Sequence, residues 1–137
     1  MDQAIPAFLN HRINVPVLAH VKDLSAHSDV AASLQAAVKP LGEVMVFCPD
    51  PQAYRYMVVS TNGIVFGFAA GMSTIAFRLD ARMKLRALAT GAQVYPECGE
   101  DWVSVLPLGN DGDWPAVDLR FWAQKAYGHA RATKYNG

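Results

Sequence analysis

Residues 54–79 decide the fold, and they read YRYMVVSTNGIVFGFAAGMSTIAFRL. Two runs of β-forming residues flank Asn62-Gly63. Both central residues of a type I′ turn need a positive φ, and Asn-Gly is the pair that best provides it. This stretch therefore predicts a β-hairpin with a two-residue loop. A third run, at residues 73–79, predicts a further strand.

The loop sets the expected register of the hairpin, in which the facing pairs are Thr61–Ile64, Val59–Phe66 and Met57–Phe68. Side chains alternate between the two faces of a strand, so one face should hold the core residues Met57, Val59, Ile64, Phe66 and Phe68. The other face should hold small residues beside Tyr54 and Tyr56. We expect that a helix packs on that second face, or that Tyr54 and Tyr56 cover its glycines; the alternative is an open face that another group approaches closely.

Strand patterns outside the hairpin lie on both sides of it. The apolar residues of 13–21 alternate, which predicts an edge strand because Pro16 cannot donate to a ladder. The continuous apolar run 44–48 predicts a buried central strand. A short strand is expected at 93–95, and a last strand at 102–108.

Helical spacing predicts three helices. The first begins at Ser28 and ends near Pro40, and its alanine-rich flanks would let a second element approach closely. The second follows an Asp80 cap, ends at Gly91, and should bury Ala81, Leu85 and Leu88. The third follows Asp113 and Pro115, ends at Gly128, and carries the apolar positions Leu119, Trp122, Ala123 and Ala126.

Adjacent strands bounded by helices predict an α+β fold. We expect a single domain over residues 1–137, with a mainly antiparallel sheet of about four to six strands packed against three helices. Residues 1–12 would form a short helix or an arm, and residues 130–137 a polar tail.

Composition limits the classes of function. Hydrophobic residues make up 52% and charged residues 18% of the chain, which is typical of a globular domain. Twelve basic residues balance twelve acidic ones, which argues against a general nucleic-acid binder. The apolar runs are too short to cross a bilayer, and we see no secretory signal. Two cysteines are too few for a disulfide framework, so we expect a reducing, cytoplasmic location.

Catalytic and metal motifs are not recognisable in the sequence. No histidine or cysteine pair has metal-ligand spacing, so we expect no metal and no cofactor. Cys98 lies between Glu97 and Glu100, whose charges would raise the thiol pKa and disfavour a nucleophile. There is no nucleophile elbow and no phosphate loop. Acidic loop residues could supply acid–base chemistry, but such residues usually form turns and caps. The sequence therefore leans away from an enzyme.

Aromatic residues provide the leading hypothesis, because tyrosine and tryptophan are favoured at protein interfaces. The chain has more large aromatic side chains than its core clearly needs. They are Tyr54, Tyr56, Trp102, Trp114, Trp122 and Tyr127. They favour a non-catalytic protein-interaction or regulatory binding module, acting as a homodimer or with a protein partner. The order of elements resembles that of small partner-binding proteins such as secretion chaperones and toxin-immunity proteins, and the resemblance implies partner binding by fold analogy. Secretion chaperones are usually acidic, whereas this chain is neutral.

The alternative is a small-molecule-binding protein or enzyme, with a pocket between the Tyr54/Tyr56 face and the final helix. The candidate binding residues are Tyr54, Arg55, Tyr56, Glu97, Asp101, Trp102 and Trp122. A basic cluster of Arg78, Arg82, Lys84 and Arg86 would bind an anion or an acidic partner. That cluster could instead be a solvated helix face, or pair with the nearby acidic loop. Contact with RNA or DNA through it is a third, weaker hypothesis.

Overall fold

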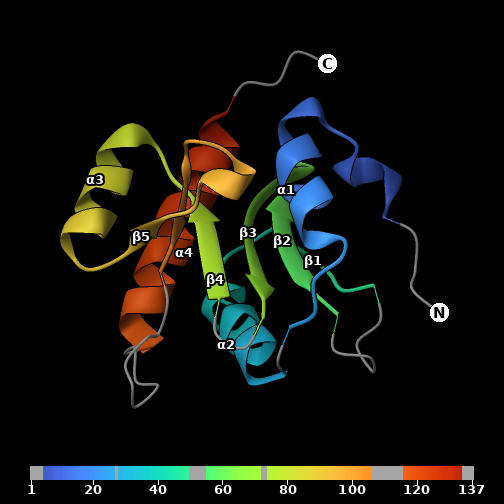
Figure 1. Cartoon of the computed structure of the whole chain (residues 1–137), viewed down its shortest axis with the longest axis horizontal. Coiled ribbons are helices and arrows are strands. Elements are labelled where there is room, and N and C mark those ends of the chain that lie inside the picture. The colour runs from blue at the N-terminus through green and yellow to red at the C-terminus, as the bar shows by residue number, and fades with distance from the viewer. Residues whose placement is uncertain (1–4, 27, 50–54, 72–73, 106–115, 134–137) are drawn as a thin grey trace.

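In the computed structural model, six strands form one antiparallel sheet in the order β1-β2-β3-β4-β6-β5 (Figure 1). The structure describes residues 5–26, 28–49, 55–71, 74–105 and 116–133. Within them, the strands are β1 Met45–Phe47, β2 Met57–Thr61, β3 Ile64–Ala70, β4 Thr74–Arg78, β5 Gln93–Val94 and β6 Trp102–Ser104. The predicted α+β class with a mainly antiparallel sheet is confirmed.

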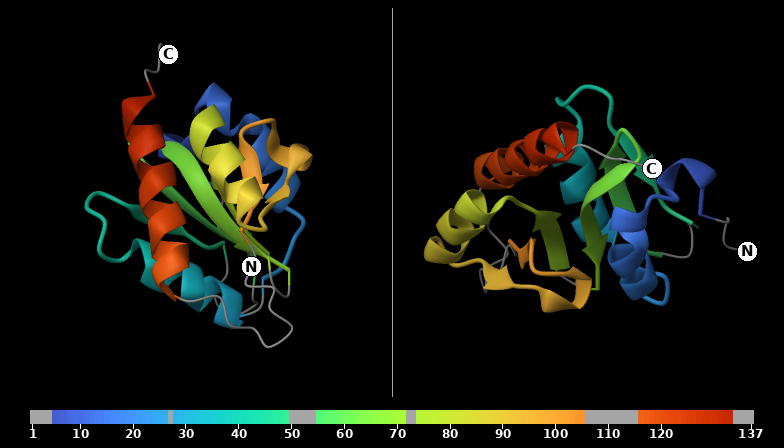
Figure 2. Two further views of the ribbon diagram at one scale, coloured as in Figure 1. Left: turned by 90° about the vertical axis from the view of Figure 1, so that its left-hand side faces the viewer. Right: turned by 90° about the horizontal axis from the view of Figure 1, so that it is seen from above.

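Helices cover both faces of this sheet (Figure 2). They are α1 Val15–Val21, α2 Ser28–Val38, α3 Ala81–Ala89 and α4 Ala116–Ala132, with 3-10 turns η1 Ala7–Leu9, η2 Arg12–Asn14 and η4 Pro96–Cys98. One core lies beneath α2 and α4 and includes Leu34 and Phe66. The second lies beneath α1 and includes Val17 and Phe68. None of the helices in the described ranges has both the length and the apolar character that crossing a bilayer requires.

The β2–β3 hairpin turns at Asn62-Gly63, as predicted. The φ angle is +54° at Asn62 and +76° at Gly63, and Thr61 pairs with Ile64. These are the left-handed angles of a type I′ turn. Farther from the turn the predicted register is wrong by one residue: the observed pairs are Val59–Gly67 and Met57–Ala69.

A β-bulge in β3 causes this shift. Ser60 pairs with Val65 and Val59 pairs with Gly67, which leaves Phe66 as the extra residue. The bulge sends Phe68 to the face opposite Phe66, where its ring packs 5.5 Å from that of Trp102. The predicted core face is therefore correct for Met57, Val59, Ile64 and Phe66 and wrong for Phe68. The second face is covered by α1, as we expected of a helix.

The segment predicted as an edge strand, residues 13–21, is helical instead. Val17 and Val21 are four residues apart, so they lie on one face of α1 and are both buried, whereas Val15 is exposed. Apolar residues four positions apart fit both the two-residue repeat of a strand and the spacing of one helix face. This ambiguity explains the wrong assignment. Pro16 lies in the first helical turn, where its missing N–H breaks no hydrogen bond.

β1 is also placed differently from its prediction. Residues 44–48 were expected to form a central strand, yet β1 lies at one edge of the sheet and pairs with β2 alone among the described strands. Met45 is 55% exposed and Val46 is 40% exposed, while Phe47 is buried. The apolar run therefore marks an exposed edge and not a buried centre.

The first two predicted helices begin where expected, but other details of the helix predictions are wrong. α2 begins at Ser28, and the Asp80 carboxylate caps α3 by accepting a hydrogen bond of 2.8 Å from the backbone N–H of Met83. Leu85 points outward and is 69% exposed, contrary to prediction. α4 passes through Gly128 to Ala132, so part of the expected tail is helical. The predicted cap at Asp113, Pro115 and the end of the last strand lie outside the described residues.

Candidate functional site

The predicted aromatic binding residues do not form one site. Tyr56 and Trp102 are buried beneath α1, and the Tyr56 ring packs edge-on against Phe47 at 6.4 Å. Trp122 belongs to α4 and is buried against the opposite face of the sheet. Tyr127 is half-buried against the same core. Tyr54 and Trp114 lie outside the described residues. Three of the six rings therefore serve the core, which weakens the aromatic argument for an interface.

The predicted pocket between the Tyr54/Tyr56 face and the final helix is not formed at Tyr56, because the sheet separates Tyr56 from α4. Tyr56 belongs to the core beneath α1, whereas α4 packs on the other face. Arg55, which was expected at the pocket rim, donates a hydrogen bond of 2.7 Å to the backbone oxygen of Lys22. Glu97 is exposed on η4.

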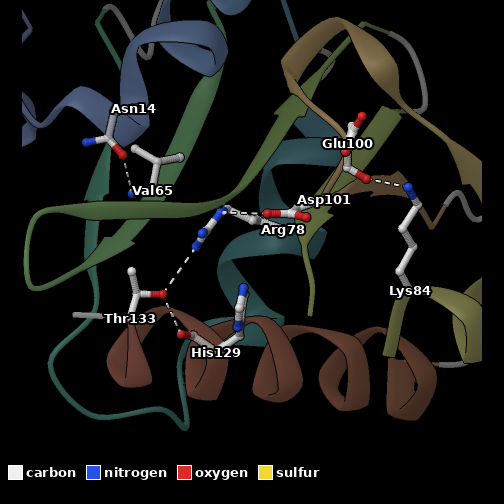
Figure 3. A network of polar contacts seen from close by, with 8 residues as sticks. All are labelled: Asn14, Val65, Arg78, Lys84, Glu100, Asp101, His129 and Thr133. Carbon is white, nitrogen blue, oxygen red and sulfur yellow. Dashed lines mark hydrogen bonds and ion pairs between the residues drawn. The ribbon is translucent and has the colours of Figure 1, made fainter. Parts of the chain in front are cut away.

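The basic cluster separates into inward and outward side chains. Arg78 is largely buried and its Nε lies 3.9 Å from an Asp101 carboxylate oxygen. Lys84 donates to the backbone oxygen of Glu100 (Figure 3). Both contacts fit the predicted alternative that this cluster pairs with the acidic loop. Arg82 and Arg86 are exposed on α3.

Arg78 also reaches the end of α4. Its Nη1 lies 3.5 Å from the Thr133 hydroxyl, which donates to the His129 backbone oxygen at 2.8 Å (Figure 3). Burial lowers the pKa of Arg78, and the Asp101 charge opposes that effect. Burial and then the Arg78 charge lower the pKa of His129 below 6.5. His129 Nε2 is buried without a hydrogen-bond partner among the described residues.

The lowered pKa of His129 predicts acid-sensitive stability. The unfolded chain takes up a proton near pH 6.5, whereas folded His129 does so only at lower pH. Protons therefore favour unfolding in that window, and the free energy of unfolding should fall as the pH drops from about 7 to about 5. Urea denaturation at a series of pH values measures this, and His129→Gln should remove its share of the slope. An NMR titration giving His129 a pKa above 6.5 would contradict it.

A second polar pair holds α1 to the strand β5 region. His20 Nε2 and the Tyr95 hydroxyl are 2.7 Å apart, and their rings pack edge-on at 5.4 Å. Burial raises the Tyr95 pKa, with further contributions from Cys98 and Glu97. Burial also raises the pKa of Cys98 to about 12, and Glu97 adds to the effect. A thiol in this state is protonated at neutral pH and is a poor nucleophile.

The described ranges contain no group of three or more histidine, cysteine or carboxylate side chains placed to hold a metal ion. The two cysteines, Cys48 and Cys98, are not joined to each other. We therefore take the surface beside the exposed edge strand β1 as the candidate site.

An open groove of about 440 Å³ lies between α2 and β1. Its lining is Ala32, Gln35, Ala36, Val38, Lys39, Leu41, Val44 and Val46. Ala32 and Ala36 are four residues apart, so they lie on the same face of α2 and leave room beside the sheet. Lys39 is the one charged side chain in the lining.

The edge strand beside this groove is positioned from two sides. Antiparallel pairing joins Val46 to Val59 on β2, and the Arg131 guanidinium holds Glu43, just before β1, through an ion pair of 2.8 Å. Alternation along β1 points Val46 into the groove and Met45 toward the α1 side. The result is an apolar strand edge beside an apolar groove. We define these nine residues, the groove lining and Met45, as the β1 edge surface.

The sequence carried one signal for this surface, the alanine-rich flanks of α2. The edge position of β1 had no such signal, because an apolar run reads the same in the centre and at the edge of a sheet. Comparison of the chain with protein-family models, with curated proteins and with solved structures gives no match in any of the three.

Proposed function

We propose that this chain is a protein-interaction module that acts by surface complementarity, and that a second copy of the chain occupies the β1 edge surface. The main support for this proposal is the exposed apolar edge of β1. Met45 is 55% exposed and Val46 is 40% exposed, and both lie beside an apolar groove. An edge strand offers unpaired backbone groups to another strand, which is a recurrent mode of protein recognition.

The charge of the surface favours a copy of itself. A twofold interface brings each residue near its own counterpart, so any charged side chain near the axis would face a like charge. Met45, Val46 and Phe47 are uncharged. Lys39 lies on the α2 side of the groove. The strand edge at the axis is therefore uncharged and apolar, which meets the requirement of self-complementarity.

The simplest arrangement pairs β1 antiparallel with β1 of the second copy about an axis at Val46. Val46 then faces Val46 of the second copy, and Met45 faces Phe47 of the second copy. Directly opposed residues point to the same face, so the two grooves join across the axis between the two α2 helices. Pairing through the same strand in both copies closes the assembly as a dimer.

The size of the surface predicts a weak dimer. The β1 edge surface has nine residues, eight from the groove and Met45, whereas a standard interface has about 20–30 residues on each side. We therefore expect a dissociation constant on the order of 1–100 µM.

Sedimentation velocity from about 1 µM to about 200 µM tests this proposal, because the range brackets the expected dissociation constant. The wild-type protein should shift from monomer toward dimer. Val46→Lys should stay monomeric, since two lysines would face each other at the axis. Val94→Lys is the matched control: Val94 is 56% exposed on β5, at the other edge of the sheet. A wild type that remains monomeric throughout, or a Val94→Lys variant that dissociates equally, would overturn the proposal.

A small apolar molecule is the second candidate occupant, because the groove volume of about 440 Å³ is within the range of ligand pockets. Native mass spectrometry separates the two. A monomer with a discrete added mass that is lost on denaturation favours the ligand, and a dimer of the bare chain favours self-association.

A reducing compartment such as the cytoplasm fits the two unjoined cysteines.

A further inference from the structure

The surface between α3 and α4 carries two cations on one aromatic ring. The Arg86 guanidinium carbon lies 5.7 Å from the centre of the Phe121 ring, and the Lys125 Nζ lies 5.3 Å from it. Arg86 comes from α3 and Lys125 from α4. The half-buried Phe121 ring thus holds two positive charges near each other on the surface.

Arg82 extends this positive surface. It is exposed one helical turn before Arg86, on the same side of α3. Among the described residues, Arg82, Arg86 and Lys125 form no ion pair with a carboxylate, whereas Arg78 faces Asp101 and Lys84 binds a backbone oxygen. We call Arg82, Arg86, Lys125, Phe121 and Leu85 the α3–α4 patch.

Leu85 adds an apolar element to the α3–α4 patch. It is 69% exposed, the highest value among the large hydrophobic residues that the structure describes as exposed. The spacing places it on the outward side of α3, between the positions of Arg82 and Ala89. An apolar side chain among cations that pair with no carboxylate of the described residues is suited to a partner that carries the complementary combination, carboxylates and an aliphatic residue.

We propose that the α3–α4 patch binds a short acidic peptide segment of a partner protein, with carboxylates against Arg82, Arg86 and Lys125 and an aliphatic side chain against Leu85. Charge complementarity selects this occupant. The site is distinct from the β1 edge surface, since α3 packs against β5 and β6, at the opposite end of the sheet from β1 (Figure 1). A dimer paired through β1 would leave both copies of the patch free.

A peptide fits this surface better than a nucleic acid does. Bases stack on open aromatic rings, but Phe121 is half-buried and already in contact with Arg86 and Lys125. Three cations neutralise few phosphates. The chain also has no net positive charge to attract a polyanion.

Fluorescence anisotropy with a labelled peptide of sequence Glu-Leu-Glu-Asp-Leu-Glu-Glu-Leu tests the proposal on the full chain. We expect a dissociation constant on the order of 10–100 µM at low salt. Raising the salt from about 50 mM to about 300 mM should weaken binding by about tenfold, because the charges are exposed and screened. A peptide with glutamine and asparagine at the acidic positions keeps the leucines and should not bind measurably.

Charge reversal at the patch supplies the matched comparison. Arg86→Glu should weaken binding of the acidic peptide by about tenfold or more, because it replaces an attraction with a repulsion. Lys22→Glu makes the same change of charge at an exposed residue on the other side of the sheet and should change binding less than about twofold. Leu85→Ser should weaken binding by about threefold at unchanged charge.

Three results would overturn the proposal: no binding of the acidic peptide up to about 1 mM, equal loss in Arg86→Glu and Lys22→Glu, or tighter binding of oligothymidylate than of the peptide. Its failure is distinguishable from that of the dimer. Arg86→Glu should leave the sedimentation behaviour unchanged, and Val46→Lys should leave peptide binding unchanged.

Discussion

Replacement of Asn14 with leucine is expected to lower the free energy of unfolding by about 3–5 kcal/mol. Asn14 is only 1% exposed. Its side-chain amide donates to the backbone oxygens of Leu9 and Gly63, at 2.7 Å and 2.8 Å, and its oxygen accepts from the Val65 N–H at 2.9 Å (Figure 3 shows the Val65 contact). Leucine fills a similar volume but leaves three backbone groups without this partner. Urea denaturation of both proteins measures the loss.

Asn14→Asp is the informative control for this prediction. A carboxylate can still accept from Val65, but it would face the two carbonyl oxygens to which the amide donates. Protonation relieves that contact, so the pKa of an aspartate at this position should lie above its usual value. The free energy of unfolding of the variant should therefore come closer to that of the wild type as the pH falls toward about 4. A loss below about 1 kcal/mol for Asn14→Leu would show that the three hydrogen bonds contribute little.

Gly63→Ala is expected to lower the free energy of unfolding by about 2–4 kcal/mol. The left-handed φ of +76° disfavours any residue with a Cβ. An added Cβ would also lie 2.6 Å from the backbone oxygen of Phe8, too close for any real contact. The change therefore strains the turn and displaces η1 from it. Thermal or urea unfolding measures the effect.

Gly128→Ala provides the opposite expectation for the same chemical change. Nothing lies within 4 Å of a Cβ added at Gly128, which is exposed inside α4. Alanine favours a helix interior, so this variant should gain up to about 1 kcal/mol. If both alanine variants destabilise equally, the close approach of Phe8 to the turn is not the cause.

The Asn14 and Gly63 predictions concern one structural unit. The Asn14 amide binds the Gly63 oxygen, and both changes release the N-terminal turns from the hairpin. Residues that share a contact are not additive. The double variant should therefore lose less stability than the sum of the two single losses, and the difference measures how strongly this segment and the hairpin turn depend on each other.

Local signals in the sequence were sufficient where one residue type decides the geometry. Asn62-Gly63 specified the turn, because few pairs of residue types adopt positive φ angles at two consecutive positions. Asp80 specified the start of α3 through a hydrogen bond to a residue three positions away. These interactions are short in sequence, so no tertiary contact was needed to predict them.

The errors arose where tertiary packing decides. In a regular strand, Phe66 and Phe68 would point to the same face of the sheet. The bulge in β3 instead places one ring in each core. Val17 and Val21 fit a strand or a helix equally well, and the second core selected the helix.

The candidate surfaces were predictable only in part. The alanines of α2 suggested close approach of another element, and Arg82 and Arg86 were in the predicted basic cluster. Lys125 was missed because it comes from a helix about forty residues away and meets Arg86 only across the Phe121 ring. Arg78 and Lys84 were assigned to the surface cluster, yet both make internal contacts. Such pairings depend on the packing of helices, which a single sequence does not specify.

Exchanging charges at Val46 shows whether the chain pairs with itself through β1 with this residue at the twofold axis. Val46→Lys and Val46→Glu are each expected to be monomeric, and native mass spectrometry of their equimolar mixture should show a heterodimer, because lysine then faces glutamate. Circular dichroism should show both variants folded, since Val46 is 40% exposed. A mixture that remains monomeric at concentrations where the wild type is dimeric would contradict this arrangement.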